Sequence, residues 1–371
     1  MKKLLGILII IAVVAVCFIH FSQGEKSEIA DNSKPVIKIG ATLPLSGDAS
    51  QFGLTSKKAL ELAVNTWNQK DTKYKYELFV EDDRGVQKNT LINAKNLINV
   101  KKVNAIITQW TPFGVIVSPL ADEAGIIHFT CSFGDEVVKG KYNFNHYTSF
   151  KEQANTLIKS FNDRNVKNIN YVVVNTAGCE EQASFVINEI KKTNINVANV
   201  SYYNPSERDF RMLIRKLETS NPDYYMLCGA PPSAQIFIKQ LGEITGKKNI
   251  TSIDTFIELN KEDLPLVEGL WFVNSASGTD TFAKFFSDNA GMEITSCTAN
   301  VYDAIDFIIY AYENTPLKEG EVIPDTDSVA NTLHKIKGYD SAVGNIEIDE
   351  NGVVVSKASV KIIKDGQIIG E

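Results

Sequence analysis

The stretch VIKIGATLPLSGDASQFG, residues 36–53, decides the fold. Its first part, residues 36–43, is an apolar run typical of a buried strand, and Pro44 and Gly47 end that run. A helix is predicted after Gly53, because small and apolar residues recur there at helical spacing, at positions 59, 62, 63, 66 and 67. A strand that passes through a short turn into a helix is the beginning of an α/β unit.

The same alternation continues along the chain. Further strands are predicted at 76–80, 105–107, 126–129, 170–174, 197–203, 224–227 and 251–253, and helices at 91–100, 112–124, 151–162, 181–192, 210–218 and 234–241. Strict succession of strand and helix predicts parallel sheets flanked by helices. The chain has 371 residues, and a single hydrophobic core does not usually organise so many. We therefore expect two Rossmann-like lobes.

The end of the chain has a different pattern. A long apolar helix is predicted at 298–313, and a last strand at 359–363. Between them, 346–349 and 353–355 read as a β-hairpin with Asn351-Gly352 in its turn. We therefore expect antiparallel strands to close an otherwise parallel domain.

The N-terminal segment predicts export. Lys2 and Lys3 precede an apolar run at 4–19, and Ser22-Gln23-Gly24 follows, so 1–24 reads as a signal peptide and 25–35 as a tether. The run is about 16 residues, short of the ~20 of a membrane span, and a retained anchor is the alternative. We expect the protein in the periplasm or on the outer face of the cell membrane.

Cys17 leaves the processing of this segment open. A cysteine at the end of the apolar run is typical of a lipoprotein signal, with the lipid attached at Cys17. The preceding Val16 is not the small residue that such processing prefers, so lipid attachment and simple cleavage stay open as alternatives. A buried cysteine with no role is a third.

Charge and cysteine content exclude several classes of function. The net charge is −7, and removal of 1–24, with its two lysines and no acid, moves it to −9. That acidity argues against nucleic acid or an anionic membrane surface as partner. The remaining cysteines are widely spaced with no C-x-x-C pair, which argues against a zinc or redox motif, and their pairing cannot be read from spacing: Cys131, Cys179, Cys228 and Cys297.

No catalytic motif is present in the sequence. The Walker, dinucleotide-binding, G-x-S-x-G and H-E-x-x-H patterns are all missing. His128 falls inside a predicted strand, where a core histidine is the simpler interpretation. We therefore expect no enzyme activity, no cofactor and no metal; an exported enzyme is a rival that would need a nucleophile–base pair.

The turns after the strands are the candidate ligand site. In a parallel α/β sheet ligands bind at the carboxyl ends of the strands, where helix N-termini favour a carboxylate. Turns 45–53, 108–114 and 130–135 all carry hydroxyls beside aromatic side chains, which predicts a pocket with a polar and an apolar end. The alternative is that these Ser and Thr residues only cap helices.

Several segments resemble a known family. Residues 37–40, 44–47 and 52–53 resemble the opening of the type I periplasmic binding proteins, and most closely the leucine/isoleucine/valine-binding proteins of ABC importers. Residues 80–83, Tyr302-Asp303-Ala304 and 344–352 are similar to later segments of that family. The resemblance implies two lobes joined by a three-strand hinge that close on a small ligand like a Venus flytrap and then dock on an ABC permease.

The resemblance also implies how the chain is divided. The crossings between lobes are expected near Phe150, Asn274 and Lys337. Lobe 1 would then comprise 36–150 and 275–337, and lobe 2 would comprise 151–274 and 338–371. The same fold also serves as the sensing ectodomain of receptor systems, which is the alternative function.

Carried over residue by residue, the family's site falls partly on matching positions. Thr111, Ser132 and Gly134 would hold the ligand's carboxylate, and Phe52 would pack on the ligand. In lobe 2, Gly178 and Ala230 stand where amino-acid binders place aromatic residues.

The ammonium end of the site matches less well. Asp254 could pair with an ammonium group, but Phe256 falls on the aligned position, and loss of that carboxylate would argue against a free α-amino acid. Four aromatic residues predict a roomy aromatic pocket instead, and core packing is the alternative for each of them: Trp110, Phe113, Phe133 and Phe256. The expected ligand is a small carboxylate, either an amino acid or a related acid, aromatic acids included.

Overall fold

The computed structural model describes residues 34–246, 249–275 and 278–371. The chain divides into two units, Met1–Pro35 and Val36–Glu371, and the account below concerns the second. The predicted signal peptide and the lipid site at Cys17 lie outside the described residues, as does most of the predicted tether. Among the residues that are described, no helix combines the length and apolarity needed to cross a membrane.

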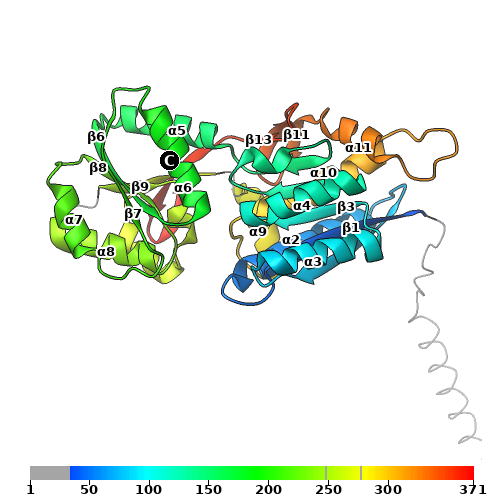
Figure 1. The fold of residues 1–371 in the computed structure, drawn as a ribbon, viewed down its shortest axis with the longest axis horizontal. Coiled ribbons are helices and arrows are strands. Elements are labelled where there is room, and N and C mark those ends of the chain that lie inside the picture. The colour runs from blue at the N-terminus through cyan, green and yellow to red at the C-terminus, as the bar shows by residue number, and fades with distance from the viewer. Residues whose placement is uncertain (1–33, 247–248, 276–277) are drawn as a thin grey trace, which may run out of the picture. The chain divides into compact units, whose positions relative to one another are not determined.

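Lobe 1 is built on a five-stranded parallel sheet in the order β2-β1-β3-β4-β5 (Figure 1). Its first elements are β1 (Val36–Leu43), α2 (Ser50–Asn68), β2 (Lys75–Asp82), α3 (Gln87–Asn96), a π-helical turn (Leu97–Lys101), β3 (Ala105–Gln109), α4 (Thr111–Ala124), β4 (Ile127–Cys131), a 3-10 turn (Asp135–Val138) and β5 (Asn143–Asn145). Later segments add α9 (Asp280–Ala290), α10 (Thr298–Asn314), α11 (Thr326–Leu333), β11 (Lys337–Ser341), β12 (Gly344–Ile348) and β13 (Val354–Val355).

Lobe 2 has a four-stranded parallel sheet in the order β7-β6-β8-β9. Its elements are α5 (Phe150–Asp163), β6 (Asn168–Val174), α6 (Ala177–Ile190), β7 (Asn196–Tyr203), α7 (Arg211–Glu218), β8 (Tyr224–Cys228), α8 (Ser233–Thr245), β9 (Ile250–Ser252), two 3-10 turns (Thr255–Glu258 and Lys261–Val267) and β10 (Trp271–Asn274). The strands β14 (Ser359–Lys364) and β15 (Gln367–Gly370) follow β10 as antiparallel neighbours.

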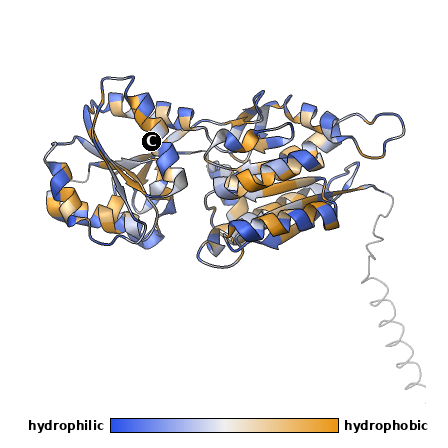
Figure 2. Cartoon of the chain, in the orientation of Figure 1, coloured by the Kyte–Doolittle hydropathy of each residue, from blue (hydrophilic) through white to orange (hydrophobic). Residues whose placement is uncertain are grey.

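Helices cover both faces of each of the two parallel sheets. In lobe 1, side chains of β1 pack with α2 and α10 in one apolar cluster, and α3 and α4 form a second cluster on the other face. The inner strands of the lobe 1 sheet are mostly apolar, whereas surface helices are apolar on one side (Figure 2). The predicted α/β class with parallel sheets flanked by helices is confirmed.

The last expected crossing between the lobes is wrong. We expected residue 338 onward to belong to lobe 2, but Ile346, Ile348 and Val354 lie in the lobe 1 core. The strand β14 is the element that then joins lobe 2, by pairing with β10. The chain therefore crosses after Val355. The alternating pattern predicts the hairpin but not which core its apolar face covers.

Several local predictions are also refined. The hairpin of β12 and β13 is confirmed, with Ile348 opposite Val354. The helix α2 begins at Ser50, so Gly53 lies inside it rather than before it. A Cβ atom at Gly53 would lie 2.1 Å from the carbonyl oxygen of Pro44, so the first turn requires glycine there.

Two disulfides tie segments that the sequence could not pair. Cys131 at the end of β4 is bonded to Cys297, the residue just before α10. Cys179 in the first turn of α6 is bonded to Cys228 at the end of β8. Both bonds lie at the carboxyl ends of strands, where the ligand site of a parallel sheet is expected.

Candidate functional site

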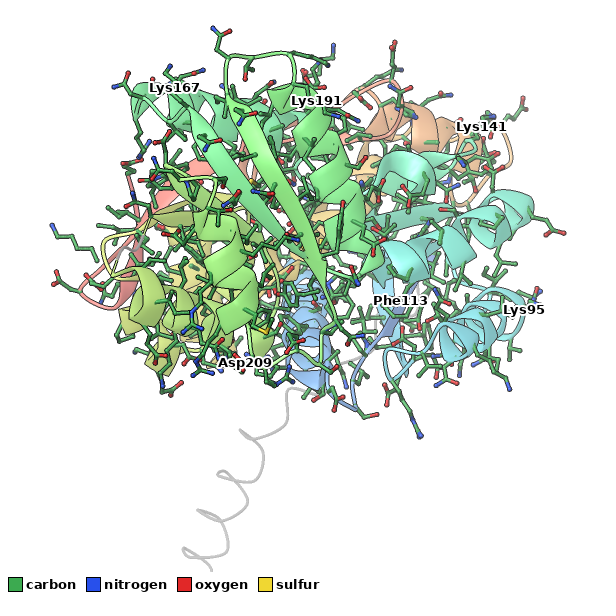
Figure 3. All side chains as sticks on the ribbon, turned by 60° about the vertical axis from the view of Figure 1, so that its left-hand side comes forward. Lys95, Phe113, Lys141, Lys167, Lys191 and Asp209 are labelled. Carbon is green, nitrogen blue, oxygen red and sulfur yellow. A yellow bond between two sulfur atoms is a disulfide. The ribbon has the colours of Figure 1, made fainter. Side chains whose placement is uncertain are left out.

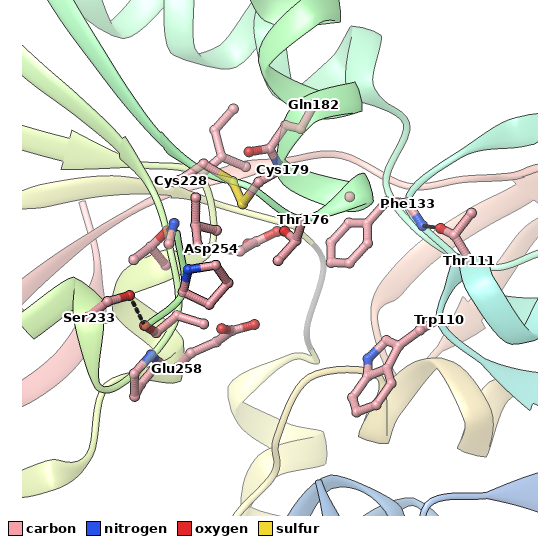
Figure 4. A pocket seen from close by; sticks show the side chains of 18 of the residues that line it. Trp110, Thr111, Phe133, Thr176, Cys179, Gln182, Cys228, Ser233, Asp254 and Glu258 are labelled. Atoms are coloured by element: carbon pink, nitrogen blue, oxygen red, sulfur yellow. Dashed lines mark hydrogen bonds between the residues drawn. A yellow bond between two sulfur atoms is a disulfide. The ribbon is translucent and has the colours of Figure 1, made fainter. Parts of the chain in front are cut away.

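A cavity at these strand ends has a volume of about 450 Å³ and is lined by both lobes. Its lobe 1 wall follows β3 and β4 and includes Trp110, Thr111 and Phe133. Its lobe 2 wall follows β6, β8 and β9 and includes Thr176, Asp254 and Glu258 (Figure 4). Phe113 lies in this region of lobe 1, whereas Lys95, Lys141, Lys167 and Lys191 project outward elsewhere (Figure 3).

The lobe 1 wall is aromatic. Trp110 contacts Phe52 edge-on with 5.6 Å between ring centroids and lies 6.2 Å from Phe113. Its backbone has a φ of 70°, which is rare for a residue with a side chain, and its N–H donates to the carbonyl of Cys131 at 2.7 Å. Backbone strain of this kind persists where the surrounding structure demands it, often at functional sites.

Thr111, the first residue of α4, offers a hydrogen-bond donor at this wall. Its hydroxyl oxygen accepts from the N–H of Phe133 at 3.1 Å and from the N–H of Gly134 at 3.5 Å. Because both of these groups donate to the oxygen, the hydroxyl hydrogen remains to donate toward the cavity. The helix N-terminus behind it adds positive potential, so this end of the cavity suits a carboxylate.

Two acidic side chains line the lobe 2 wall. Asp254 accepts hydrogen bonds from the hydroxyl of Tyr147 at 2.6 Å, the N–H of Ser275 at 2.7 Å and the hydroxyl of Ser275 at 2.5 Å. Glu258 lies at the end of the 3-10 turn that follows Asp254. Burial raises the pKa of Asp254; burial, and then the charge of Asp254, raise the pKa of Glu258 to about 8.

These acids share the cavity with no cation from the described part of the chain. Among the described residues, the cavity lining contains no Lys, Arg or His. A buried carboxylate without a partner charge is unfavourable, and a positively charged group on a ligand would relieve it. The buried Oε1 of Gln182 also has no hydrogen-bond partner in the described chain, whereas its Nε2 donates to Gln153 at 3.1 Å. This wall therefore favours a ligand group that is cationic and donates hydrogen bonds.

Most of the predicted site residues line this cavity, and three do not. The lining includes Phe52, Trp110, Thr111, Phe133, Gly178, Ala230 and Asp254. Ser132 and Gly134 lie behind it: the hydroxyl of Ser132 pairs with that of Thr130 at 2.7 Å, and Gly134 reaches the site only through its bond to Thr111.

Phe256 does not line this cavity. Its side chain is completely buried in the lobe 2 core, where it packs on Phe272 with 5.7 Å between ring centroids. Residues 255–258 form a 3-10 turn, which directs Phe256 inward while Asp254 and Glu258 face the cavity. The sequence interpretation missed Glu258, together with Thr176 and Gln182. The four-residue spacing of the two acids was the available signal for Glu258.

The histidine and metal expectations can be compared with the described residues. His128 is fully buried and contacts Thr108 at 2.9 Å and Asn143 at 2.8 Å, which confirms its interpretation as a core histidine. Burial lowers its pKa to about 4, so it is neutral at physiological pH. Within the described ranges, no group of three or more His, Cys, Asp or Glu side chains is placed to hold a metal ion.

The fold and site are those of a ligand-binding protein, and comparison with known proteins identifies the family. Residues 36–367 match the model of the periplasmic binding protein family, so the chain belongs to that family. Its members bind ligands outside the cytoplasm and are not enzymes. The predicted resemblance to this family is therefore confirmed.

Individual relatives lie in the branched-chain amino-acid branch. The chain is 24% identical to Leu/Ile/Val-binding protein homolog 3 of Brucella melitensis, with 90% of this chain and 93% of the relative covered. It is 21% identical to the Leu/Ile/Val-binding protein BraC3 of Rhizobium johnstonii, with 87% and 90% covered.

Solved structures share the fold. A leucine-binding protein, LivK, of Thermotoga maritima superposes with a TM-score of 0.76 at 23% identity, covering 90% of this chain and 97% of the other. A solute-binding protein of an ABC transporter from Rhodopseudomonas palustris, solved with 3,4-dihydroxybenzoic acid, has a TM-score of 0.76 at 18% identity, with 90% and 95% covered. LivJ of Streptococcus pneumoniae, solved with isoleucine, has a TM-score of 0.75 at 17% identity, with 90% and 97% covered.

Proposed function

We propose that the protein is the solute-binding component of an ABC importer and captures an amino acid with a large apolar or aromatic side chain between its two lobes. The observation that carries this proposal is the division of the cavity into a hydroxyl donor on one wall, two carboxyl groups on the other, and aromatic rings on the lobe 1 side. A zwitterion matches both polar ends at once.

The carboxylate of the ligand would lie at Thr111, whose hydroxyl hydrogen is free to donate. The ammonium group would lie at Asp254 and Glu258, which stand two residues before and two residues after Phe256. These carboxyl groups would supply the partner for an ammonium group that the sequence interpretation doubted. The apolar body would pack against Trp110 and Phe133. A volume of about 450 Å³ accommodates an aromatic side chain.

The relatives support the ligand class without defining it. Those most similar in sequence are named for leucine, isoleucine and valine, and structural neighbours were solved with isoleucine and with an aromatic acid. Closure would be a hinge motion about the crossings expected near Phe150 and Asn274 and the crossing after Val355. An ABC permease is the proposed partner of the closed form, and a lipid at Cys17 or a retained N-terminal anchor would hold the protein at the membrane.

Calorimetric titration with three related compounds tests this proposal. L-Phenylalanine carries both polar groups, 3-phenylpropanoate lacks the ammonium group, and 2-phenylethylamine lacks the carboxylate. We expect phenylalanine to bind at least tenfold more tightly than either analogue, because each lost charged hydrogen bond is worth about 1.5–3 kcal/mol. Equal binding of 3-phenylpropanoate would instead make the protein a binder of aromatic acids, and no binding of any of the three would refute the proposed ligand class.

Two variants assign the ends of the site. Thr111→Ala should weaken the binding of phenylalanine more than the binding of 2-phenylethylamine, which has no carboxylate. Asp254→Asn should weaken the binding of phenylalanine more than the binding of 3-phenylpropanoate, which has no ammonium group. Thr219→Ala, at an exposed helix end in lobe 2, is the matched control and should bind as the parent protein does. If Thr111→Ala bound phenylalanine unchanged, the carboxylate assignment would be wrong.

A further inference from the structure

A second, much smaller cavity lies behind the ligand cavity. Its volume is about 10 Å³, and its polar lining includes Asp254, Glu258, Ser275, Ser296 and Asn300. Asp254 and Glu258 line both cavities and so form the wall between them. A volume of this size holds one water molecule when several polar groups surround it. We refer to it as the hinge cavity.

Asn300 is the unusual member of this lining. Its side chain is 1% exposed, and neither Nδ2 nor Oδ1 has a hydrogen-bond partner among the described residues. It is the third residue of α10. The helix begins after Cys297, which is held there by its disulfide to Cys131 and has a left-handed φ of 68°. A buried polar atom without a hydrogen-bond partner is unfavourable, so a buried amide with two such atoms requires a polar neighbour.

The occupant that satisfies both amide atoms is water. A water molecule accepts a hydrogen bond from Nδ2 and donates one to Oδ1, whereas a metal cation could satisfy only Oδ1. Across the hinge cavity, Asp254 already accepts three hydrogen bonds from Tyr147 and Ser275. Glu258 accepts none from the described chain, so it is the group that can take the remaining hydrogen bond of the water.

We propose that Asn300 acts as a positioning residue that holds Glu258 through one water molecule in the hinge cavity and so sets ligand affinity. Asn300 is anchored in the lobe 1 core by α10, and Glu258 belongs to the lobe 2 turn after β9. The bridge therefore joins the two lobes behind the ligand. It fixes the carboxyl group that is to meet the ligand's ammonium, and in this respect the inference rests on the proposed function.

The first test needs no ligand. The ionisation of Glu258 in the full chain is followed by carbon NMR of its side-chain carboxyl, in the parent protein and in Asn300→Leu, which keeps the size of the side chain and removes both polar atoms. Because the bridging water stabilises the charged carboxylate, its loss should raise the pKa of Glu258 by about one unit. Asn314→Leu, at the exposed end of the same helix, is the control and should leave that pKa unchanged.

The second test measures affinity, with L-phenylalanine as the probe. Asn300→Leu should speed dissociation about tenfold and leave association nearly unchanged, as for loss of one charged hydrogen bond. In the Glu258→Gln variant, adding Asn300→Leu should change the dissociation rate little further. If Asn300 had a purely structural role, its substitution would speed dissociation in both backgrounds. Asn300→Ser, which keeps a polar group and leaves room for water, should retain part of the affinity and serves if the leucine variant folds poorly.

The outcomes are separable. An unchanged pKa of Glu258 in Asn300→Leu overturns the positioning role, whether or not phenylalanine binds. Failure of phenylalanine to bind the parent protein refutes the proposed function instead. Affinity that depends on sodium or potassium, with choline as the inert control cation, would place a cation rather than water in the hinge cavity and would also overturn the inference.

Discussion

Replacing Phe256 by alanine should destabilise lobe 2 strongly without removing a ligand contact. The side chain is completely buried and packs on Phe272. A buried phenylalanine removes about 200 Å² from water, which at about 25 cal/mol per Å² is about 5 kcal/mol. Compactness of the unfolded chain lowers this figure, and the cavity left behind adds to it, so we expect a loss of about 3–5 kcal/mol.

Differential scanning calorimetry measures this effect. A unit as long as Val36–Glu371 unfolds with an entropy of about 0.7 kcal/mol/K, so a loss of 4 kcal/mol lowers Tm by about 6 °C, and by about twice that if lobe 2 unfolds alone. Phe52→Ala is the matched control, because Phe52 is partly exposed at the cavity wall. It should lower Tm less and weaken ligand binding more. If Phe256→Ala unfolded like the parent protein but lost ligand binding, the placement of Phe256 in the core would be refuted.

Two further predictions concern the acids and the disulfides. Burial raises the pKa of Glu258 from its ordinary value of 4.5 to about 8, so the folded protein holds this proton more tightly and is less stable as pH rises from about 5 to about 8. Glu258→Gln should flatten that decline in Tm; an unchanged slope would mean that another group causes it. Cys131–Cys297 spans 166 residues and Cys179–Cys228 spans 49, so chain entropy predicts losses of up to about 5 and about 4 kcal/mol when each pair is replaced by serine. The second pair lines the ligand cavity, and Cys297 of the first pair lines the hinge cavity beside Asn300, so removal of either pair should also change ligand affinity in a titration. Affinity left unchanged by removal of Cys179–Cys228 would contradict the account.

The fold was largely predictable because buried parallel strands are apolar along their length. The run at 36–43 and the helical spacing after it describe β1 and α2 almost as they stand. The helix α11 and the strands β5, β10, β11 and β15 were missed, because so few residues establish no period. The helix α9 was also missed, although it has 11 residues and its buried Phe282 and Phe286 lie at helical spacing. Packing decides which lobe contains the hairpin at Ile346, and the periodicity of the sequence carries no information about that packing.

The site was predictable where a residue's position follows from the sheet itself. Thr111 and Trp110 come directly after β3, and the carboxyl end of a parallel strand is where a ligand is expected. Phe256 was misplaced because a 3-10 turn, which gives little sequence signal, decides which of the residues 254–258 face the cavity. The disulfide between Cys179 and Cys228 and the unpaired amide of Asn300 depend on contacts that only the folded chain shows.

The structure of the protein crystallised with an amino acid that it binds in titration tests the central claim most directly. The account predicts the α-carboxylate within hydrogen-bond distance of the Thr111 hydroxyl and the ammonium group beside Asp254 and Glu258, with the side chain against Trp110 and Phe133. A ligand bound between the lobes with its ammonium group on the lobe 1 wall, or with neither polar group at these residues, would contradict it.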